Sequence, residues 1–144
     1  MLSSSAKPQV PADQALLVVE DSPTERHLLE AMLVRHHYRV LGASSAEEGA
    51  DILAHTPVAA VLMDIVLPGM NGFQAILHYR KEGLLPPHTP IVICTTKNTE
   101  SDRAWGLRQG AQWYLTKPIQ ETELLSVLQS LLQRQPDNTR AVPV

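Results

Sequence analysis

The residues of this sequence that could do chemistry stand at the ends of short apolar segments. Glu20 and Asp21 follow ALLVV, Asp64 follows VAAVLM, Thr95 follows IVIC, and Lys117 comes soon after QWYL. Clustered carboxylates repel one another unless a cation neutralises them, and oxygen ligands favour a hard ion such as Mg²⁺. A lysine and a hydroxyl beside such a cluster suit the transfer of a phosphoryl group to a carboxylate. These residue types therefore predict Mg²⁺-dependent phosphoryl transfer, provided that the fold brings them together.

Each residue has an expected role in that chemistry. Glu20, Asp21 and Asp64 are the candidate metal ligands. Asp64 is also the candidate nucleophile, because a carboxylate at the end of a buried strand can attack a phosphoryl donor in line. Lys117 would offset the charge that develops on the phosphoryl oxygens. Thr95 would donate a hydrogen bond to the acquired group and draw its loop inward, which predicts a switch rather than a steady hydrolase.

The same residues also have ordinary structural explanations. Glu20 and Asp21 could be the acidic residues that the dipole of any helix favours at its start. Asp64 could cap a turn, Thr95 could cap or pack, and Lys117 could be a solvated loop lysine. All these explanations would have to hold together at one edge of a sheet, and that coincidence favours the phosphoryl-transfer site.

Elements of two kinds must position these side chains. Apolar segments rich in Val, Ile and Leu alternate with segments of helical periodicity, and they predict strands over residues 15–19, 38–43, 58–63, 90–94 and 112–115. Strands that are buried on both faces and separated by helices form a parallel sheet, so we expect a doubly wound α/β domain. Ligands of such domains bind beyond the carboxyl ends of the strands, where the candidate residues stand.

The predicted helices begin at recognisable capping residues. In SPTE, Ser22 is the expected N-cap, Pro23 suits the first turn, and Glu25 would complete a capping box. The second, third and fourth helices are expected to begin at Ser44 or Ser45, at Asn71 and at Thr99, respectively. Gly110 is expected to end the fourth helix. The expected apolar face of the first helix is Leu28, Leu29, Met32 and Leu33, and the last helix is predicted over residues 121–133.

Length and composition limit the possible partners and location. The 144 residues suit one domain, predicted over residues 15–134, between a flexible N-terminal arm (1–14) and a flexible C-terminal tail (135–144). The net charge of -3, with both signs mixed, argues against nucleic acid as a partner. No secretory signal or membrane span is evident, so we expect a cytoplasmic protein that does not insert into membranes. The single cysteine, Cys94, is expected to be buried and inert.

Four segments, LLVVEDSPTE, VLMDIVLPGMNGF, IVICTT and GAQWYLTKP, together resemble the CheY-like family of response-regulator receiver domains. The resemblance implies a flavodoxin-like five-stranded sheet of order 2-1-3-4-5. It implies a phosphoacceptor at Asp64, an acidic metal-binding pair at Glu20 and Asp21, a phosphate-sensing hydroxyl at Thr95 and the invariant lysine of the family at Lys117. A histidine kinase would then be the phosphodonor, and the protein would be a monomer or a weak dimer.

The resemblance extends to three further features. Val66 matches the position that lends a backbone carbonyl to the metal. Tyr114 matches the switch aromatic of the family, although it could also be a half-buried strand tyrosine. The Lys117–Pro118 bond matches the family's cis peptide. Partners in this family often dock on the fourth and fifth helices and the fifth strand.

Two positions depart from the family pattern. Glu20 stands where aspartate is commoner, which could alter the geometry or affinity of the metal site. Trp113 stands where a polar residue is usual, and adjacent strand residues face opposite sides, so Trp113 and Tyr114 cannot both point into one core. With Trp105, these residues could form an aromatic partner surface or could pack between a helix and the sheet.

Within the family, the segments SPTE, MDIVLPGMNGFQA, TTK, WGLRQGA and YLTKP are similar to stand-alone PilH-type regulators of type IV pilus chemosensory systems. This narrower resemblance implies a role in twitching motility and a partner related to motility or the pilus.

Three other functions compete with this one, and the residues argue against the first. A phosphatase of the haloacid dehalogenase class would need a second aspartate two residues after Asp64, and that position is Val66. A pseudo-receiver would act as an interaction module without phosphorylation, and the Glu20 substitution leaves room for it. A phosphate sink for a sister regulator would have the same site residues. In the main interpretation the chain is a receiver that gains and loses its own phosphoryl group, not a turnover enzyme.

Overall fold

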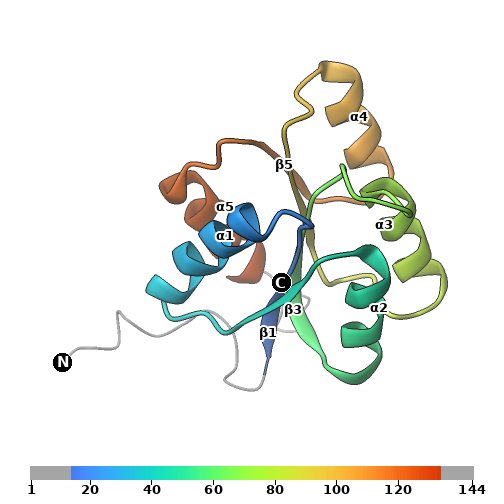
Figure 1. Cartoon of the computed structure of the whole chain (residues 1–144), viewed down its shortest axis with the longest axis horizontal. Helices are drawn as coiled ribbons and strands as arrows, with labels where there is room; N and C mark the ends of the chain where they lie inside the picture. The colour runs from blue at the N-terminus through green and yellow to red at the C-terminus, as the bar shows by residue number, and fades with distance from the viewer. Residues whose placement is uncertain (1–13, 134–144) are drawn as a thin grey trace, which may run out of the picture.

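The computed structural model describes residues 14–133, in which five strands alternate with five helices (Figure 1). The strands are β1 (Ala15–Val19), β2 (Val40–Ala43), β3 (Val58–Met63), β4 (Ile91–Thr95) and β5 (Trp113–Thr116). The helices are α1 (Pro23–Arg35), α2 (Ala46–His55), α3 (Gly72–Lys81), α4 (Glu100–Arg108) and α5 (Glu121–Gln133). The predicted arm, apart from Gln14, and the predicted tail lie outside the described residues. No helix among residues 14–133 is long and apolar enough to cross a membrane.

All strand pairs in the sheet are parallel, and the strand order is β2-β1-β3-β4-β5. This confirms the predicted fold class and the order that the family resemblance implied. The interior strands β1, β3 and β4 are buried along their whole length, as their continuous apolar sequences require.

The boundaries of three predicted strands were wrong by one or two residues. β2 begins at Val40 rather than Tyr38, because the Tyr38 amide donates back to the Leu33 carbonyl and completes the end of α1. β4 begins after Pro90, which has no N–H for the ladder, and it runs on to Thr95. β5 likewise covers residues 113–116 instead of 112–115.

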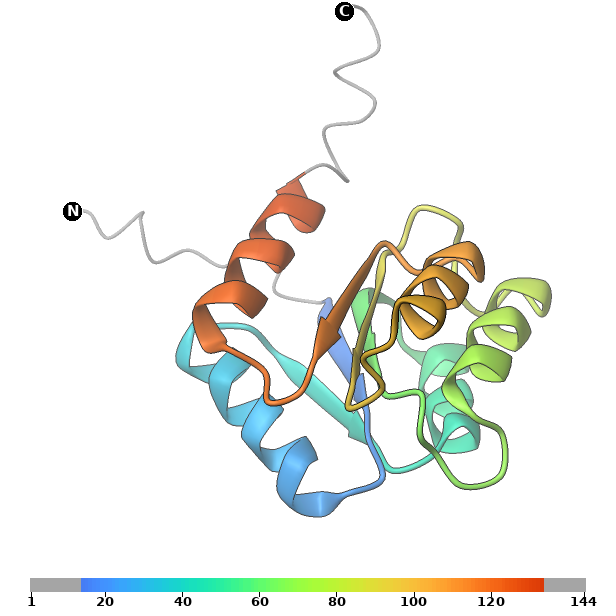
Figure 2. The same ribbon diagram turned by 90° about the horizontal axis from the view of Figure 1, so that it is seen from above.

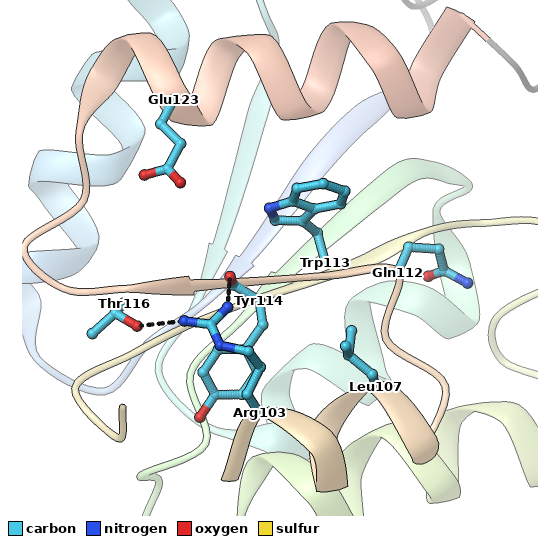
Figure 3. Close-up of a pocket in the computed structure, with 7 residues that line it drawn as sticks. All are labelled: Arg103, Leu107, Gln112, Trp113, Tyr114, Thr116 and Glu123. Atoms are coloured by element: carbon cyan, nitrogen blue, oxygen red, sulfur yellow. Dashed lines mark hydrogen bonds between the residues drawn. The ribbon is translucent and has the colours of Figure 1, made fainter. Parts of the chain in front are cut away.

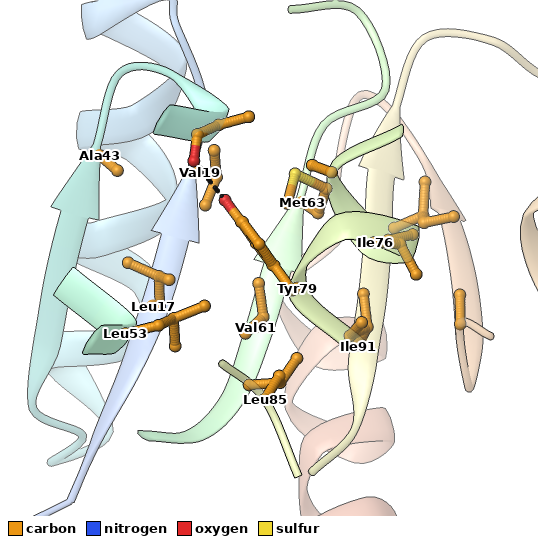
Figure 4. Close-up of a cluster of buried hydrophobic side chains, with 14 of the residues drawn as sticks. Leu17, Val19, Ala43, Leu53, Val61, Met63, Ile76, Tyr79, Leu85 and Ile91 are labelled. Atoms are coloured by element: carbon orange, nitrogen blue, oxygen red, sulfur yellow. Dashed lines mark hydrogen bonds between the residues drawn. The ribbon is translucent and has the colours of Figure 1, made fainter. Parts of the chain in front are cut away.

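Helices cover both faces of the sheet. Figures 1 and 2 show α1 and α5 on one face and α2, α3 and α4 on the other. A hydrophobic core lies on each face of the sheet, and successive strand residues point into the two cores alternately. Leu16 and Val18 of β1 pack with α1 and α5, while Leu17 and Val19 pack with α2 and α3 (Figure 4). The sheet is thus the middle of three layers, and its carboxyl edge is left for polar residues.

The predicted N-caps are confirmed at Ser22, Ser45, Asn71 and Thr99, each of which accepts a hydrogen bond from the amide three residues on. The capping box predicted at Ser22 is only half formed. Ser22 Oγ accepts from the Glu25 amide, but the Ser22 amide donates to Glu20 Oε2 at 3.1 Å instead of to Glu25. The carboxylate of Glu25 is therefore left for another partner.

The apolar face of α1 is narrower than predicted. Leu29 and Leu33 are buried and Met32 is partly buried, but Leu28 is 56% exposed. Leu28 lies one residue off the stripe that faces the sheet, about 100° around the helix from Leu29.

Candidate functional site

The carboxyl ends of four parallel strands bring the predicted site residues together. Glu20 and Asp21 follow β1, Asp64 follows β3, Thr95 ends β4 and Lys117 follows β5. Glu20, Asp21 and Asp64 each offer a carboxylate oxygen, and these three oxygens lie within 4.8 Å of one another. Among the described residues this acidic triad is the one group of three or more His, Cys, Asp or Glu side chains that could hold a metal ion.

Glu20 is the most deeply buried acid of the triad, with an exposure of 1%. Its carboxylate accepts hydrogen bonds from the Ser22 amide and from Lys117 Nζ, and its backbone carbonyl accepts from Arg26 Nη1 at 2.8 Å. Burial raises the pKa of Glu20, and the nearby charge of Asp64 raises it further, against the lowering effect of the two hydrogen bonds. A cation at this carboxylate would stabilise its ionised form.

Asp64 is held on both carboxylate oxygens. Oδ1 accepts from the Val66 amide at 3.1 Å and Oδ2 accepts from Lys117 Nζ at 3.0 Å. The Asp64 amide donates to the Val19 carbonyl, which continues the pairing of β3 with β1. Gly72 packs against the backbone here, since a Cβ at this glycine would lie 2.3 Å from the Asp64 carbonyl oxygen. Asp64 is thus fixed at the edge, with 7% of its side chain exposed.

Lys117 is the basic centre of the site. Its ammonium donates to Glu20 Oε1, Glu25 Oε1 and Asp64 Oδ2, and its side chain is 11% exposed. Burial alone would lower the pKa of Lys117, but the hydrogen bonds to the three carboxylates outweigh it and raise the pKa. The lysine therefore stays protonated at neutral pH.

Glu25 is the one residue of this constellation that sequence reasoning placed elsewhere, in the capping box of α1. No signal in the sequence identified its partner, because the contact depends on how the first turn of α1 faces the end of β5.

Thr95 of β4 and Tyr114 of β5 lie across β3 from Glu20, because the strand order is β2-β1-β3-β4-β5. Both side chains hydrogen-bond to the backbone of the same loop residue, Lys97. Thr95 is fully buried, and its Oγ1 accepts from the Lys97 amide at 3.4 Å. The Tyr114 hydroxyl donates to the Lys97 carbonyl at 2.6 Å, and the ring is 2% exposed. The side chain of Arg103 covers this ring with its guanidinium 5.0 Å from the ring centre, and it donates to the Tyr114 carbonyl. The alternative of a half-buried strand tyrosine is wrong, since the ring is almost completely enclosed.

The three aromatic residues of the predicted partner surface have different environments. A groove of about 430 Å³ lies between α4, β5 and α5, and Trp113 and Tyr114 line it from opposite sides of β5 (Figure 3). Trp113 is 48% exposed, which confirms that it faces away from Tyr114. Trp105 is 47% exposed, but it packs edge-on against Phe73 of α3 and does not line this groove. Trp113 and Tyr114 therefore share this groove without Trp105, and a partner surface formed by all three residues stays a prediction.

Two further expectations concern the neighbourhood of the site. The Lys117–Pro118 peptide bond is cis, as the resemblance implied. Val66 is 49% exposed and its amide donates to Asp64 Oδ1, while the metal-binding role of its carbonyl stays a prediction.

Comparison with known proteins agrees with this fold. Residues 16–129 match the response regulator receiver domain family, and the chain belongs to that family. It is 44% identical over 117 residues to the protein PilH of Pseudomonas aeruginosa, a match that covers 81% of this chain and 96% of PilH. It is also 33% identical to the transcriptional regulatory protein AfsQ1 of Streptomyces coelicolor, of which the match spans 52%.

Solved structures give the same result. The receiver domain of the sensor histidine kinase PA1611 from Pseudomonas aeruginosa, described with a magnesium ion coordinated in its active site cleft, is 32% identical. The TM-score is 0.75, and the match covers 84% of this chain and 98% of that one. A CheY-like receiver domain from Methanospirillum hungatei has a TM-score of 0.79 at 24% identity over 87% of this chain and 98% of its own, which supports the fold alone. The chain is thus a receiver domain of a two-component response regulator and a homologue of PilH.

Proposed function

We propose that this chain is a response regulator that accepts a phosphoryl group from a histidine kinase on Asp64 in a Mg²⁺-dependent reaction. The observation that carries the proposal is the environment of Asp64. Its carboxylate lies beside two other acids, is held by Lys117 Nζ at 3.0 Å and sits at the carboxyl edge of the sheet. A carboxylate placed between a cation site and an ammonium group is arranged to attack a phosphoryl donor.

The donor set of the site fits Mg²⁺. Three carboxylates with oxygens within 4.8 Å of one another supply hard ligands, and no sulfur or imidazole ligand belongs to the group. Glu20, Asp21 and Asp64, with the Val66 carbonyl, are the residues that would hold the ion. When bound, it would neutralise negative charge on the triad and on the phosphoryl oxygens.

The residues of the chain account for the transfer step. A carboxylate oxygen of Asp64 forms the new bond to phosphorus while the bond from phosphorus to a kinase histidine nitrogen breaks, and the electron pair returns to the imidazole. Lys117 supplies positive charge to the transferred group. Among the described residues the Thr95 hydroxyl accepts one hydrogen bond and donates none, so its hydrogen is available to a phosphoryl oxygen.

Rearrangement at Thr95 gives the switch. When Thr95 turns toward a phosphoryl oxygen, the loop that starts at Thr96 moves with it, because the Lys97 amide is bonded to Thr95. The Lys97 carbonyl is bonded to the Tyr114 hydroxyl, so the movement reaches β5 and the groove beside α4 and α5. The protein thus gains and loses its own phosphoryl group. Hydrolysis of the acyl phosphate at Asp64 returns the protein to its unphosphorylated state, without turnover of another molecule.

The likeness to PilH supports a role in type IV pilus or twitching-motility signalling, with a motility or pilus-related partner. We place the protein in the cytoplasm, as a monomer or weak dimer with no nucleic acid or membrane partner. A phosphate sink for a sister regulator is the alternative within the same chemistry, and a phosphorylation-independent pseudo-receiver is the alternative outside it.

Labelling with acetyl phosphate tests the proposal. Intact-mass analysis should detect one labile phosphoryl group on the wild type in the presence of Mg²⁺, and none on Asp64→Asn. Asp51→Asn, which removes an exposed carboxylate from α2, serves as the matched control and should be labelled normally. No label on the folded wild type under any condition would support the pseudo-receiver.

A further inference from the structure

Lys117 has no hydrogen-bond donor to spare. An ammonium group carries three N–H donors, and the three donors of Lys117 go to Glu20, Glu25 and Asp64. Only 11% of the side chain is exposed, so little room is left for another acceptor. The proposed function requires Lys117 to donate to a phosphoryl oxygen, and one of the three carboxylates must therefore give up its place.

Burial decides which carboxylate leaves. The side chains of Glu20 and Asp64 are 2% and 7% exposed, and each is held by a second hydrogen bond from a backbone amide. The side chain of Glu25 is 46% exposed, and among the described residues its carboxylate has no hydrogen-bond partner except Lys117. Separating a buried ion pair leaves an uncompensated charge, whereas an exposed carboxylate is hydrated as it leaves. Glu25 is the carboxylate that can be released at least cost.

The start of α1 shows why Glu25 is available. In a complete capping box its carboxylate would accept from the Ser22 amide. That amide donates to Glu20 instead, which leaves the Glu25 carboxylate to reach across to Lys117. The sequence EDSPTE thus places two glutamates in contact with one lysine, one buried and one half-exposed.

We propose that Glu25 is a positioning residue that occupies, in the unphosphorylated protein, the place on Lys117 that a phosphoryl oxygen takes on phosphorylation. This inference rests on the proposed function at Asp64. Glu25 then holds Lys117 in place before transfer and competes with the phosphoryl group for it. Glu25 also lines an apolar groove of about 340 Å³, together with Leu28, Met32, Pro118 and Ile119. The release of Glu25 from Lys117 therefore also changes the rim of this groove.

Removing the competing carboxylate should speed phosphorylation. In Glu25→Gln the ion pair is lost and the side-chain size is kept, so the second-order rate constant for labelling by phosphoramidate should rise about two- to fivefold, the effect of one partly exposed ion pair. Glu30→Gln is the matched control, because Glu30 is on the same helix but lies near Gly42 of β2. It should be labelled at the wild-type rate.

Two readouts separate this role from general repulsion of anionic donors. Competition for Lys117 predicts a similar gain with acetyl phosphate and phosphoramidate, which differ in charge, and no gain when Glu25→Gln is made in a Lys117→Gln background. A gain that depends on donor charge, or that persists without Lys117, would overturn the inference.

A direct measurement does not depend on the rate. The ¹³C resonance of the Glu25 carboxylate should move toward that of a solvated glutamate when wild-type protein is saturated with Mg²⁺ and beryllium fluoride, a phosphoryl mimic. An unmoved resonance in a protein that is labelled on Asp64 would contradict the role of Glu25 alone. A wild type that is never labelled would instead contradict the proposed function.

Discussion

The side chains of Thr95 and Tyr114 hydrogen-bond to the backbone amide and the backbone carbonyl of one residue, Lys97. The Lys97 amide donates to Thr95 Oγ1 at 3.4 Å, and the Lys97 carbonyl accepts from the Tyr114 hydroxyl at 2.6 Å. Both side chains are buried, one at the end of β4 and the other in the edge strand β5. A change in the bonding of Thr95 therefore passes to Tyr114 through a single loop residue.

Removing the Tyr114 hydroxyl should loosen this loop. Tyr114→Phe loses the bond to the Lys97 carbonyl but keeps the ring beneath Arg103, so we expect a loss of about 0.5–1.5 kcal/mol in the free energy of unfolding. Hydrogen exchange of residues 96–99 should become faster. Tyr79→Phe is the control, because it removes the bond from another buried tyrosine of the same core, whose hydroxyl donates to the Ala46 carbonyl and not to the Lys97 loop. The control should leave exchange in residues 96–99 unchanged, and the same result in Tyr114→Phe would show that Tyr114 does not hold the loop.

Lys117 should stabilise the site as well as serve the transfer. Lys117→Gln leaves buried Glu20 and Asp64 without their cation, and we expect a loss of about 1–3 kcal/mol in the free energy of unfolding without Mg²⁺. Mg²⁺ should restore part of this loss, because it would neutralise the same carboxylates. Urea titrations with and without Mg²⁺ measure both effects. Lys97→Gln, which removes an exposed lysine, should change neither, and an Mg²⁺-insensitive Lys117→Gln would argue against a cation site.

Cys94 should react only when the protein opens. The thiol is 1% exposed, and burial raises its pKa to about 12 from a usual value of 9.0. The native state therefore binds more protons than the unfolded state between these two values. The stability that this thiol contributes is fully present below pH 9.0 and is lost as the pH rises through 12.

Labelling by a disulfide reagent at pH 8 tests this prediction. The rate in native protein should follow the unfolded fraction and rise with urea in parallel with unfolding. Rapid labelling without denaturant would place Cys94 at the surface.

The acyl phosphate at Asp64 should be long-lived. Val66 and Lys97 flank the site, and neither is an acid or an amide that could orient an attacking water. Val66→Asn introduces such a group, so we expect hydrolysis to accelerate on the order of tenfold. Lys97→Ala tests the other flank, and decay can be followed by the loss of the label after the donor is removed. Unchanged decay in both variants would exclude this explanation of lifetime.

The fold and the main site could be predicted because a parallel sheet collects strand ends. Asp64 and Lys117 are 53 residues apart in the chain, yet the alternation of strands and helices places both at one edge. Strand boundaries were harder to predict, because buried residues stand one or two positions before the first residue of β2 and of β4. Pro90 and Tyr38 are buried like strand residues, but Pro90 has no amide hydrogen to donate, and the Tyr38 amide donates to the end of α1.

The contact between Glu25 and Lys117 could not be predicted, because two local rules compete at the start of α1. The capping-box pattern assigns Glu25 to the Ser22 amide, but the buried Glu20 carboxylate takes that amide. The orientation of one helix turn toward β5 then decides the outcome. The exposure of Leu28 could not be predicted either, because periodicity gives the direction of the apolar face of a helix but not its width.

In the proposed function, Asp64 is the residue that carries the phosphoryl group. After labelling with acetyl phosphate and Mg²⁺, borohydride reduction converts an aspartyl phosphate to homoserine, and peptide mass spectrometry then locates the modified residue. Conversion of Asp64 alone, dependent on Mg²⁺ and lost when Asp21 is replaced by asparagine, is the predicted result. Conversion at another carboxylate, or none in folded protein, would show that Asp64 is not the phosphoacceptor.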